Sequence, residues 1–158
     1  MNADAGALAR AEEVIAACRA LGFALAGIAL ARPSDHGDAF RRWIAEGCHG
    51  PMAYLAEEPG RRLDPRILLP GARSVVCVAD RYADGRPDRR VPGTGRIARY
   101  ARGEDYHVVI RARLDALADG LQRRHPSERF RACVDTAPVM EREHAERAGL
   151  GRIGKHTC

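Results

Sequence analysis

The sequence of 158 residues predicts an α+β domain, a layered mixed sheet with flanking helices. Two long segments, residues 7–21 and those from Asp105 onward, repeat apolar side chains every three or four positions, as amphipathic helices do. Three short apolar or alternating segments, 23–31, 74–79 and 129–134, are typical of strands. The helices and strands follow one another at irregular spacing, which favours an α+β arrangement over regular βαβ units.

In the first half of the chain, glycine and proline separate the expected elements. Gly22 can end the first helix in a left-handed conformation. A second helix is expected around Phe40 and stops at Gly47, and Pro51 can open a short third one. Residues 57–73 are rich in turn-forming and basic residues.

The second half begins with a polar loop over residues 84–95. The helix from Asp105 is expected to place five apolar or aromatic side chains on one face: Tyr106, Ile110, Leu114, Leu117 and Leu121. Residues 129–134 alternate at period two, which predicts a half-buried strand. A last helix is expected over residues 138–148, supported by the pairs Arg142/Glu146 and Glu143/Arg147 one turn apart.

Composition indicates one globular domain over residues 1–158. Hydrophobic residues make up 46% and charged residues 30% of the chain. The formal net charge of +5 permits binding to phosphates or RNA. The first residues show no long apolar run of the signal-peptide kind, and no apolar run reaches membrane-spanning length. We therefore expect a cytoplasmic protein that does not engage the membrane.

The cysteines do not form a recognisable ligand set. No CxxC motif occurs, and an odd number of scattered thiols argues against a disulfide framework or a metal site. We expect free thiols in a reducing compartment and no metal ligands. The five residues are Cys18, Cys48, Cys77, Cys133 and Cys158.

Asp135 allows two interpretations. It stands between an alternating segment and Pro138, among small and apolar neighbours. An aspartate before a proline-started helix is a good N-cap. A carboxylic acid among apolar side chains also has a raised pKa and can deliver a proton. On these residues alone the cap is the simpler interpretation.

Other candidates have equally plain structural alternatives. Gly149, Gly151 and Gly154 match a dinucleotide-binding spacing, but they follow a helix where that fingerprint should follow a strand. The same tail presents Lys155, the only lysine, next to His156. Arginine pairs in the loops at 61–62 and 96–99 would suit an anionic ligand or simply face solvent. His107 is either a first-turn surface residue or a ligand-facing one.

The order of four motifs resembles one known family. They are GCHGPMAYL, RRLDPRILLPGARSVV, GRIARYARGEDYHVVIRARL and VDTAPVMEREHAERAGLGRIGKHT. Together they are similar to the N-terminal domain of the epoxyqueuosine reductases, from about residue 12 to 157. The resemblance implies a cobalamin-binding domain with the fold of cobalamin-processing and reductive dehalogenase proteins. The resemblance also implies a partner, a ferredoxin-like domain that holds two [4Fe–4S] clusters. Together the two domains would reduce epoxyqueuosine in the tRNA anticodon loop to queuosine.

The resemblance implies roles for individual residues. It makes Asp135 the proton donor, which reverses the simpler interpretation given above. It places the following residues toward cobalamin: Arg62, Arg96, Tyr100, Asp135, Lys155 and His156. It places Arg142 toward the tRNA substrate, and we expect the ligand-facing His107 there as well. The cysteine-rich segment that binds the clusters is not in this chain, so electrons are expected to arrive through an iron–sulfur domain.

Two other functions fit the same residues. The chain could be a non-catalytic cobalamin carrier, because it has no cluster ligands of its own. It could also be an RNA-binding module that uses its basic surface. Cobalamin binding separates the RNA-binding module from the other two, and turnover with a cluster-bearing partner separates enzyme from carrier. The sequence leaves the oligomeric state open.

Overall fold

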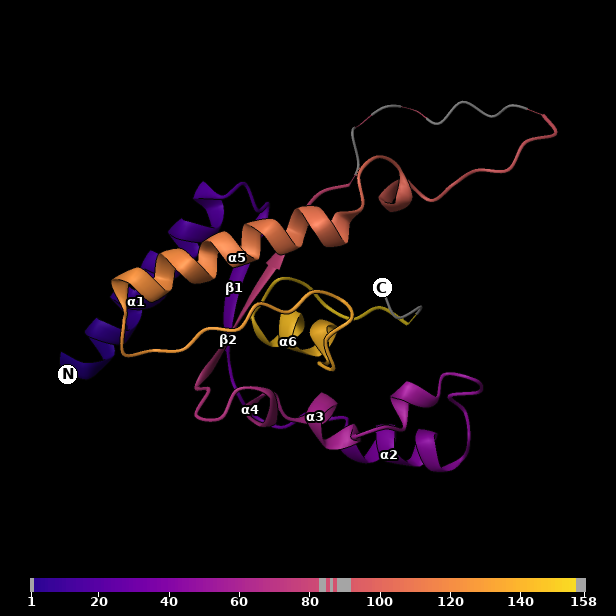
Figure 1. The fold of residues 1–158 in the computed structure, drawn as a ribbon, viewed down its shortest axis with the longest axis horizontal. Coiled ribbons are helices and arrows are strands. Elements are labelled where there is room, and N and C mark those ends of the chain that lie inside the picture. Colours follow the sequence, from indigo (N-terminus) through magenta and orange to yellow (C-terminus); the bar gives the residue numbers. More distant parts are fainter. Residues whose placement is uncertain (1, 83–84, 86, 88–91, 156–158) are drawn as a thin grey trace. The chain divides into compact units, whose positions relative to one another are not determined.

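The computed structural model describes residues 2–82, 85, 87 and 92–155, and it combines helices with a small sheet (Figure 1). The predicted α+β class is confirmed. Among the described residues the sheet has two strands, β1 (Leu25–Leu30) and β2 (Ser74–Ala79). The Ala31 N–H, just past β1, donates to the Arg73 carbonyl, just before β2, at 3.0 Å, so the strands are antiparallel.

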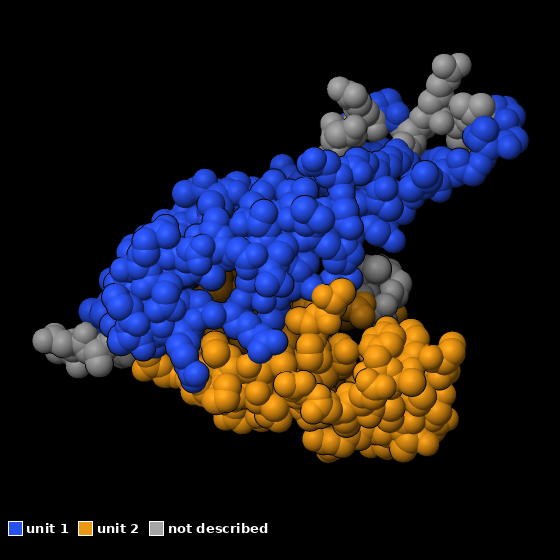
Figure 2. Space-filling view, in the orientation of Figure 1, with its two compact units in different colours: residues 1–25, 78–135 blue, residues 26–77, 136–158 orange. Residues whose placement is uncertain are grey.

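The chain forms two compact units, each made of two separate stretches (Figure 2). Unit 1 comprises Met1–Leu25 and Val78–Asp135, and unit 2 comprises Ala26–Cys77 and Thr136–Cys158. Both strands therefore cross from one unit to the other along the chain. The expectation of a single functional domain over residues 1–158 stays a prediction.

Unit 1 is built on two long helices, α1 (Asn2–Ala20) and α5 (Tyr106–Arg124), which lie side by side (Figure 1). Glu13 of α1 pairs with Arg124 at 3.2 Å and with His125 at 3.4 Å. Arg113 of α5 pairs with Asp80 after β2 at 2.6 Å. A short 3₁₀ helix, η2 (Arg99–Ala101), precedes α5. The buried apolar side chains of this unit are Cys18, Phe23, Leu117 and Leu121.

Unit 2 contains shorter helices around the remaining strand residues. They are α2 (Gly37–Ala45), η1 (Ala53–Leu55), α3 (Pro59–Leu63), α4 (Pro65–Leu68) and α6 (Glu141–Arg147). The segment after α6 packs closely on β1. A Cβ at Gly27 would overlap the Ala148 carbonyl oxygen and come within 2.5 Å of Leu150 Cδ1. Only a residue without a side chain fits at Gly27 with this packing.

A buried polar network joins α6 to the segment after β1. Glu143 Oε1 accepts the Asp35 backbone N–H at 2.7 Å, and its Oε2 accepts the Ser34 hydroxyl. Arg147 pairs with Glu143 at 2.5 Å and with Asp35 at 2.9 Å, and it donates to the Pro33 carbonyl at 2.9 Å. These contacts fix α6 against residues 33–35 inside unit 2.

The turn-rich segment 57–73 contains two short helices, because Pro59 and Pro65 open them and Asp64 accepts the Arg66 N–H as a cap at 3.0 Å. Two expectations from the sequence were wrong. Residues 129–134 form no strand. An alternating pattern also needs a neighbouring strand to bond with, and the described sheet pairs only β1 with β2.

The second wrong expectation concerns the start of the last helix. It begins at Glu141, with Met140 at the N-cap position, where residues 138–148 were expected. Asp135 therefore caps no helix, and the structural interpretation considered for it is excluded. The expected polar loop at 84–95 lies partly outside the described residues.

Candidate functional site

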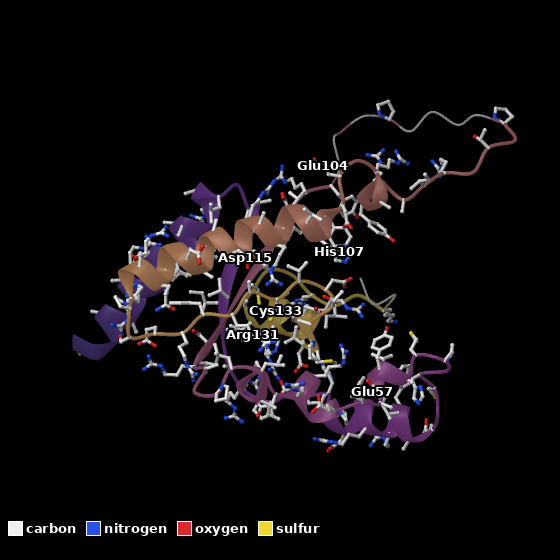
Figure 3. All side chains as sticks on the ribbon, viewed as in Figure 1. Glu57, Glu104, His107, Asp115, Arg131 and Cys133 are labelled. Carbon is white, nitrogen blue, oxygen red and sulfur yellow. The ribbon has the colours of Figure 1, made fainter. Side chains whose placement is uncertain are left out.

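The start of α5 brings together the most notable polar cluster of unit 1. Asp105 is the N-cap of α5, and its carboxylate accepts the His107 backbone N–H at 2.9 Å. The same carboxylate contacts His107 Nδ1 at 2.7 Å. On its other side the His107 ring contacts Asp135 Oδ2 through Nε2 at 2.9 Å. Figure 3 shows His107 projecting from the first turn of α5. One imidazole thus bridges two carboxylates.

Asp135 adopts an unusual backbone conformation. Its φ is +41°, in the left-handed region that side chains other than glycine seldom occupy, although aspartate tolerates it better than most. Such conformations cluster at functional sites, where the surrounding structure holds them in place. Here the Tyr106 hydroxyl donates to Asp135 Oδ2 at 3.3 Å beside the His107 contact.

The two oxygens of Asp135 are therefore not equivalent. His107 and Tyr106 both bind Oδ2, whereas Oδ1 has no hydrogen bond among the described residues. The side chain is 59% exposed, so the closed apolar pocket expected from its sequence neighbours is absent in this conformation. One oxygen is anchored, and the other is open to a ligand.

The cluster shifts the pKa of its members in consistent directions. Hydrogen bonds to Asp135 and then to Asp105 raise the pKa of His107, because both stabilise the imidazolium. The backbone and side-chain hydrogen bonds from His107 lower the pKa of Asp105. Desolvation, followed by the nearby Asp135 charge, raises the pKa of Tyr106. These directions favour a protonated His107 between the carboxylates.

Aromatic rings continue from this cluster. The Tyr106 and His107 rings stack with centroids 4.0 Å apart. Tyr100 meets Tyr106 edge-on at 6.3 Å, and Tyr82 meets Tyr100 in the same way at 6.4 Å. Tyr82 and Tyr100 are 68% and 56% exposed. The site therefore extends from a charged centre into an exposed aromatic row.

The structure brings only some of the expected site residues together. Asp135 and His107 are in direct contact, and Tyr100 reaches them through the Tyr106 ring. Arg96 is exposed before η2 in the same unit. Three expected residues belong to unit 2: Arg62 on α3, Arg142 on α6 and Lys155 near the end. His156 lies outside the described residues.

Sequence reasoning missed Asp105 and Tyr106 as members of the site. A signal for Asp105 was present, because an aspartate before an amphipathic helix predicts a cap that orients the residues of the first turn. Tyr106 was assigned to the apolar face of α5, although its hydroxyl bonds to Asp135. Only the tertiary structure shows that this helix start meets the segment around residue 135.

Other features of the chain add little to this site. Cys18, Cys48, Cys77 and Cys133 are free thiols, and Cys158 lies outside the described residues. Within the part of the chain that the structure describes, no group of three or more histidine, cysteine or acidic side chains could hold a metal ion. No helix there is both long and apolar enough to span a bilayer.

Comparison with known proteins decides the family. A family model described as "Epoxyqueuosine reductase QueG, DUF1730" matches residues 62–136, the stretch that holds every member of the cluster. A curated epoxyqueuosine reductase from Gloeobacter violaceus is 45% identical over 153 residues, which are 94% of this chain and 46% of that protein. The chain belongs to the epoxyqueuosine reductase family. It spans less than half the length of this relative.

Solved epoxyqueuosine reductases share the fold. One, in complex with an epoxyqueuosine-modified stem loop of tyrosine tRNA, is 32% identical with a TM-score of 0.69. The match covers 92% of this chain and 40% of that one. Another, from Bacillus subtilis, has an aspartate-bearing catalytic loop swung out of the active site. It is 29% identical with a TM-score of 0.68, over 92% of this chain and 39% of that one.

Proposed function

We propose that this chain is the cobalamin-binding part of an enzyme that reduces epoxyqueuosine to queuosine in tRNA, with Asp135 as proton donor. The proposal rests on the backbone conformation and the hydrogen bonds of Asp135. The residue has a left-handed backbone, one oxygen held by His107 and Tyr106, and the other without a partner in the described chain. Family membership supports the reaction, since the relatives are named for it.

The chemistry of an epoxide explains the need for such an acid. Opening the ring leaves an oxygen that carries negative charge and must take up a proton. A carboxylic acid fixed beside that oxygen supplies the proton without waiting for water. Asp135 is 59% exposed here. Bound substrate and cofactor would cover much of that exposed surface.

The segment around Asp135 is suited to reorientation. Residues 129–134 have no regular structure, and α6 does not begin until Glu141. The relative from Bacillus subtilis has its aspartate-bearing catalytic loop swung out of the active site. We assign the same kind of loop to residues 134–140 of this chain.

The described residues fit a corrin cofactor in one respect. Contiguous exposed apolar surface marks ligand sites. Tyr82 after β2 contacts Tyr100 shortly before α5, and these rings are 68% and 56% exposed; Ile97, in the segment before α5, is 68% exposed. Cobalamin, when bound, would supply an electron-rich cobalt centre for the reduction. We assign its binding to Arg62, Arg96, Tyr100 and Lys155, with His156 beyond the described residues.

The rest of the reaction requires groups outside this chain. We propose that [4Fe–4S] clusters in a further domain supply electrons and that residues 1–158 act as one functional domain. We assign Arg142 and His107 to the tRNA side, where Arg142 would bind phosphate. A tRNA substrate implies a cytoplasmic enzyme.

The test compares two substitutions in full-length enzyme that contains these residues. Asp135→Asn keeps the shape but removes the transferable proton, so epoxide reduction should fall by about 10²–10⁴-fold while the fold persists. Asp119→Asn, on an exposed position of α5, is the matched control and should retain full activity. Normal turnover by the Asp135 variant would exclude the donor role.

Absorption spectra of the isolated chain titrated with cobalamin test the cofactor assignment. A saturable spectral change is expected, and retention of no cobalamin by folded protein would contradict it. Cobalamin binding without turnover in the full-length enzyme would indicate a carrier. RNA binding without cobalamin binding would indicate an RNA-binding module.

A further inference from the structure

We propose that His107 is a proton-relay residue that reloads Asp135, and that Asp105 holds its ring in the relay orientation. The inference rests on the proposed function and deepens it by naming the source of the second proton. Removing an epoxide oxygen as one molecule of water consumes two electrons and two protons. The cobalamin and iron–sulfur groups proposed above supply the electrons. One carboxylic acid supplies only one of the protons, so Asp135 must be reprotonated within the reaction.

His107 lies within hydrogen-bond distance of Asp135 and can therefore supply the second proton to it. Nε2 lies 2.9 Å from Asp135 Oδ2, and Nδ1 lies 2.7 Å from Asp105 Oδ1. Because an ionised carboxylate only accepts hydrogen bonds, both ring nitrogens must donate when both partners are ionised, and such a ring is an imidazolium. The groups that face His107 are Asp105, Asp135 and the stacked Tyr106. The raised pKa of His107 agrees with this charge state.

The relay moves one proton from His107 to Asp135, and solvent returns a proton to His107. After Asp135 has given its first proton away, the Nε2–H bond of His107 breaks and an O–H bond forms at Asp135 Oδ2. The imidazolium becomes a neutral imidazole that keeps its Nδ1–H toward Asp105. A half-turn of the carboxyl group about Cβ–Cγ then exchanges its two oxygens and presents the new proton. His107 recovers a proton from solvent, to which 37% of its side chain is exposed.

Asp105 has a separate, positioning role. Its carboxylate accepts both the backbone N–H and the ring Nδ1–H of His107, so it fixes the ring orientation from the helix start. Without this carboxylate the ring could turn, and its pKa would fall toward the ordinary value for histidine. The residue that caps α5 therefore also orients the imidazole that donates the proton to Asp135.

Nitrogen-15 NMR of the histidine rings in the whole chain tests the proton state without any cofactor. We expect His107 to show two N–H groups at neutral pH and a pKa above 6.5. Asp135→Asn should lower this pKa, and Asp105→Asn should lower it as well. A His107 ring that carries a single N–H at pH 6 would overturn the relay.

Kinetics in the full-length enzyme then test the relay itself. His107→Gln removes the transferable proton, so kcat should fall by about 10²-fold or more and the alkaline limb of the pH profile should disappear. Asp105→Asn keeps the ring, so it should move that limb to lower pH. His125→Gln is the control, since this histidine at the other end of α5 also meets a carboxylate, that of Glu13.

The outcomes separate the two proposals. If Asp135→Asn retains activity, the proposed donor role fails, and the NMR measurement still decides the charge of His107. If Asp135 is required but His107→Gln keeps the wild-type rate and pH profile, the donor role stands and the relay is wrong. If His107→Gln does not fold, the shift of the alkaline limb in Asp105→Asn decides, and an unmoved limb overturns the relay.

Discussion

Glu143 and Arg147, one turn apart on α6, form an ion pair of 2.5 Å with side chains only 5% and 11% exposed. The Ser34 hydroxyl and the Asp35 backbone N–H complete the hydrogen bonding of the glutamate. The buried Arg147 Nε has no hydrogen-bond partner among the described residues, so the network is not fully satisfied. Removing one member of a buried ion pair is nevertheless costly.

Glu143→Gln should therefore destabilise the chain strongly. The change removes the glutamate charge from the buried pair, while Arg147 keeps its ion pair with Asp35. The loss should therefore approach, without exceeding, the cost of about 3–5 kcal/mol of an uncompensated buried charge. Urea denaturation of both proteins measures the difference. Asp38→Asn breaks the exposed pair with Arg41, which should cost no more than about 1 kcal/mol. Equal losses of stability for the two variants would show that burial of the α6 ion pair does not increase its contribution.

Gly27→Ala and Gly6→Ala should change stability in opposite directions. A Cβ at Gly27 would overlap the Ala148 carbonyl oxygen and press on Leu150, so α6 or β1 must shift. We expect a loss of about 1–3 kcal/mol. Gly6 lies in α1 with nothing within 4 Å of the added methyl, so alanine there should add about 0.5–1 kcal/mol. Thermal unfolding of both variants measures these effects, and a harmless Gly27→Ala would contradict the packing described here.

His144 should make the fold sensitive to acid. Its side chain is buried, and its Nδ1 has no hydrogen-bond partner among the described residues. Desolvation, followed by the Arg147 charge, lowers its pKa. A histidine with a lowered folded pKa takes up protons on unfolding, so stability is full above about pH 6.5 and declines as pH falls below it. His144→Leu should remove this part of the decline. Unfolding free energies between pH 5 and 8 test it, and parallel curves would refute it.

The thiols should react in an order set by burial. Desolvation raises the pKa of Cys77 to about 11, so almost none of it is thiolate at pH 8. Cys48 is exposed. Iodoacetamide treatment of the folded chain followed by mass spectrometry should modify Cys48 first and Cys77 only after unfolding. Early modification of Cys77 would mean that this strand opens readily.

The sequence predicted correctly those helices and strands that are specified by residues within the same segment. The strand at 74–79 was placed at its observed bounds, and the helix from Asp105 was correct because periodicity and cap agree in one segment. The pair Glu143/Arg147 was foreseen from its spacing but expected only to support a helix. It is buried because Ser34 and Asp35, more than one hundred residues earlier, lie against it.

The site itself depends on tertiary structure. Nothing in the local sequence indicates that Asp135 adopts φ +41° or that His107, 28 residues earlier, meets its carboxylate. The strand expected at 129–134 failed for a related reason, because strand formation depends on a neighbour that a single segment cannot reveal. The sequence analysis named Asp135 and His107 separately, but not the contact between them.

Because α1 packs on α5, α1 can take its native packing during synthesis only after α5 has been translated. The partner of the first helix is translated roughly one hundred residues later, which takes about 5–20 s at ordinary elongation rates. Until then α1 lacks the helix that it packs against in the folded chain, and most helical stability in proteins comes from such packing. During translation, α1 therefore stays available to chaperones, and slow synthesis of the middle of the chain lengthens that exposure.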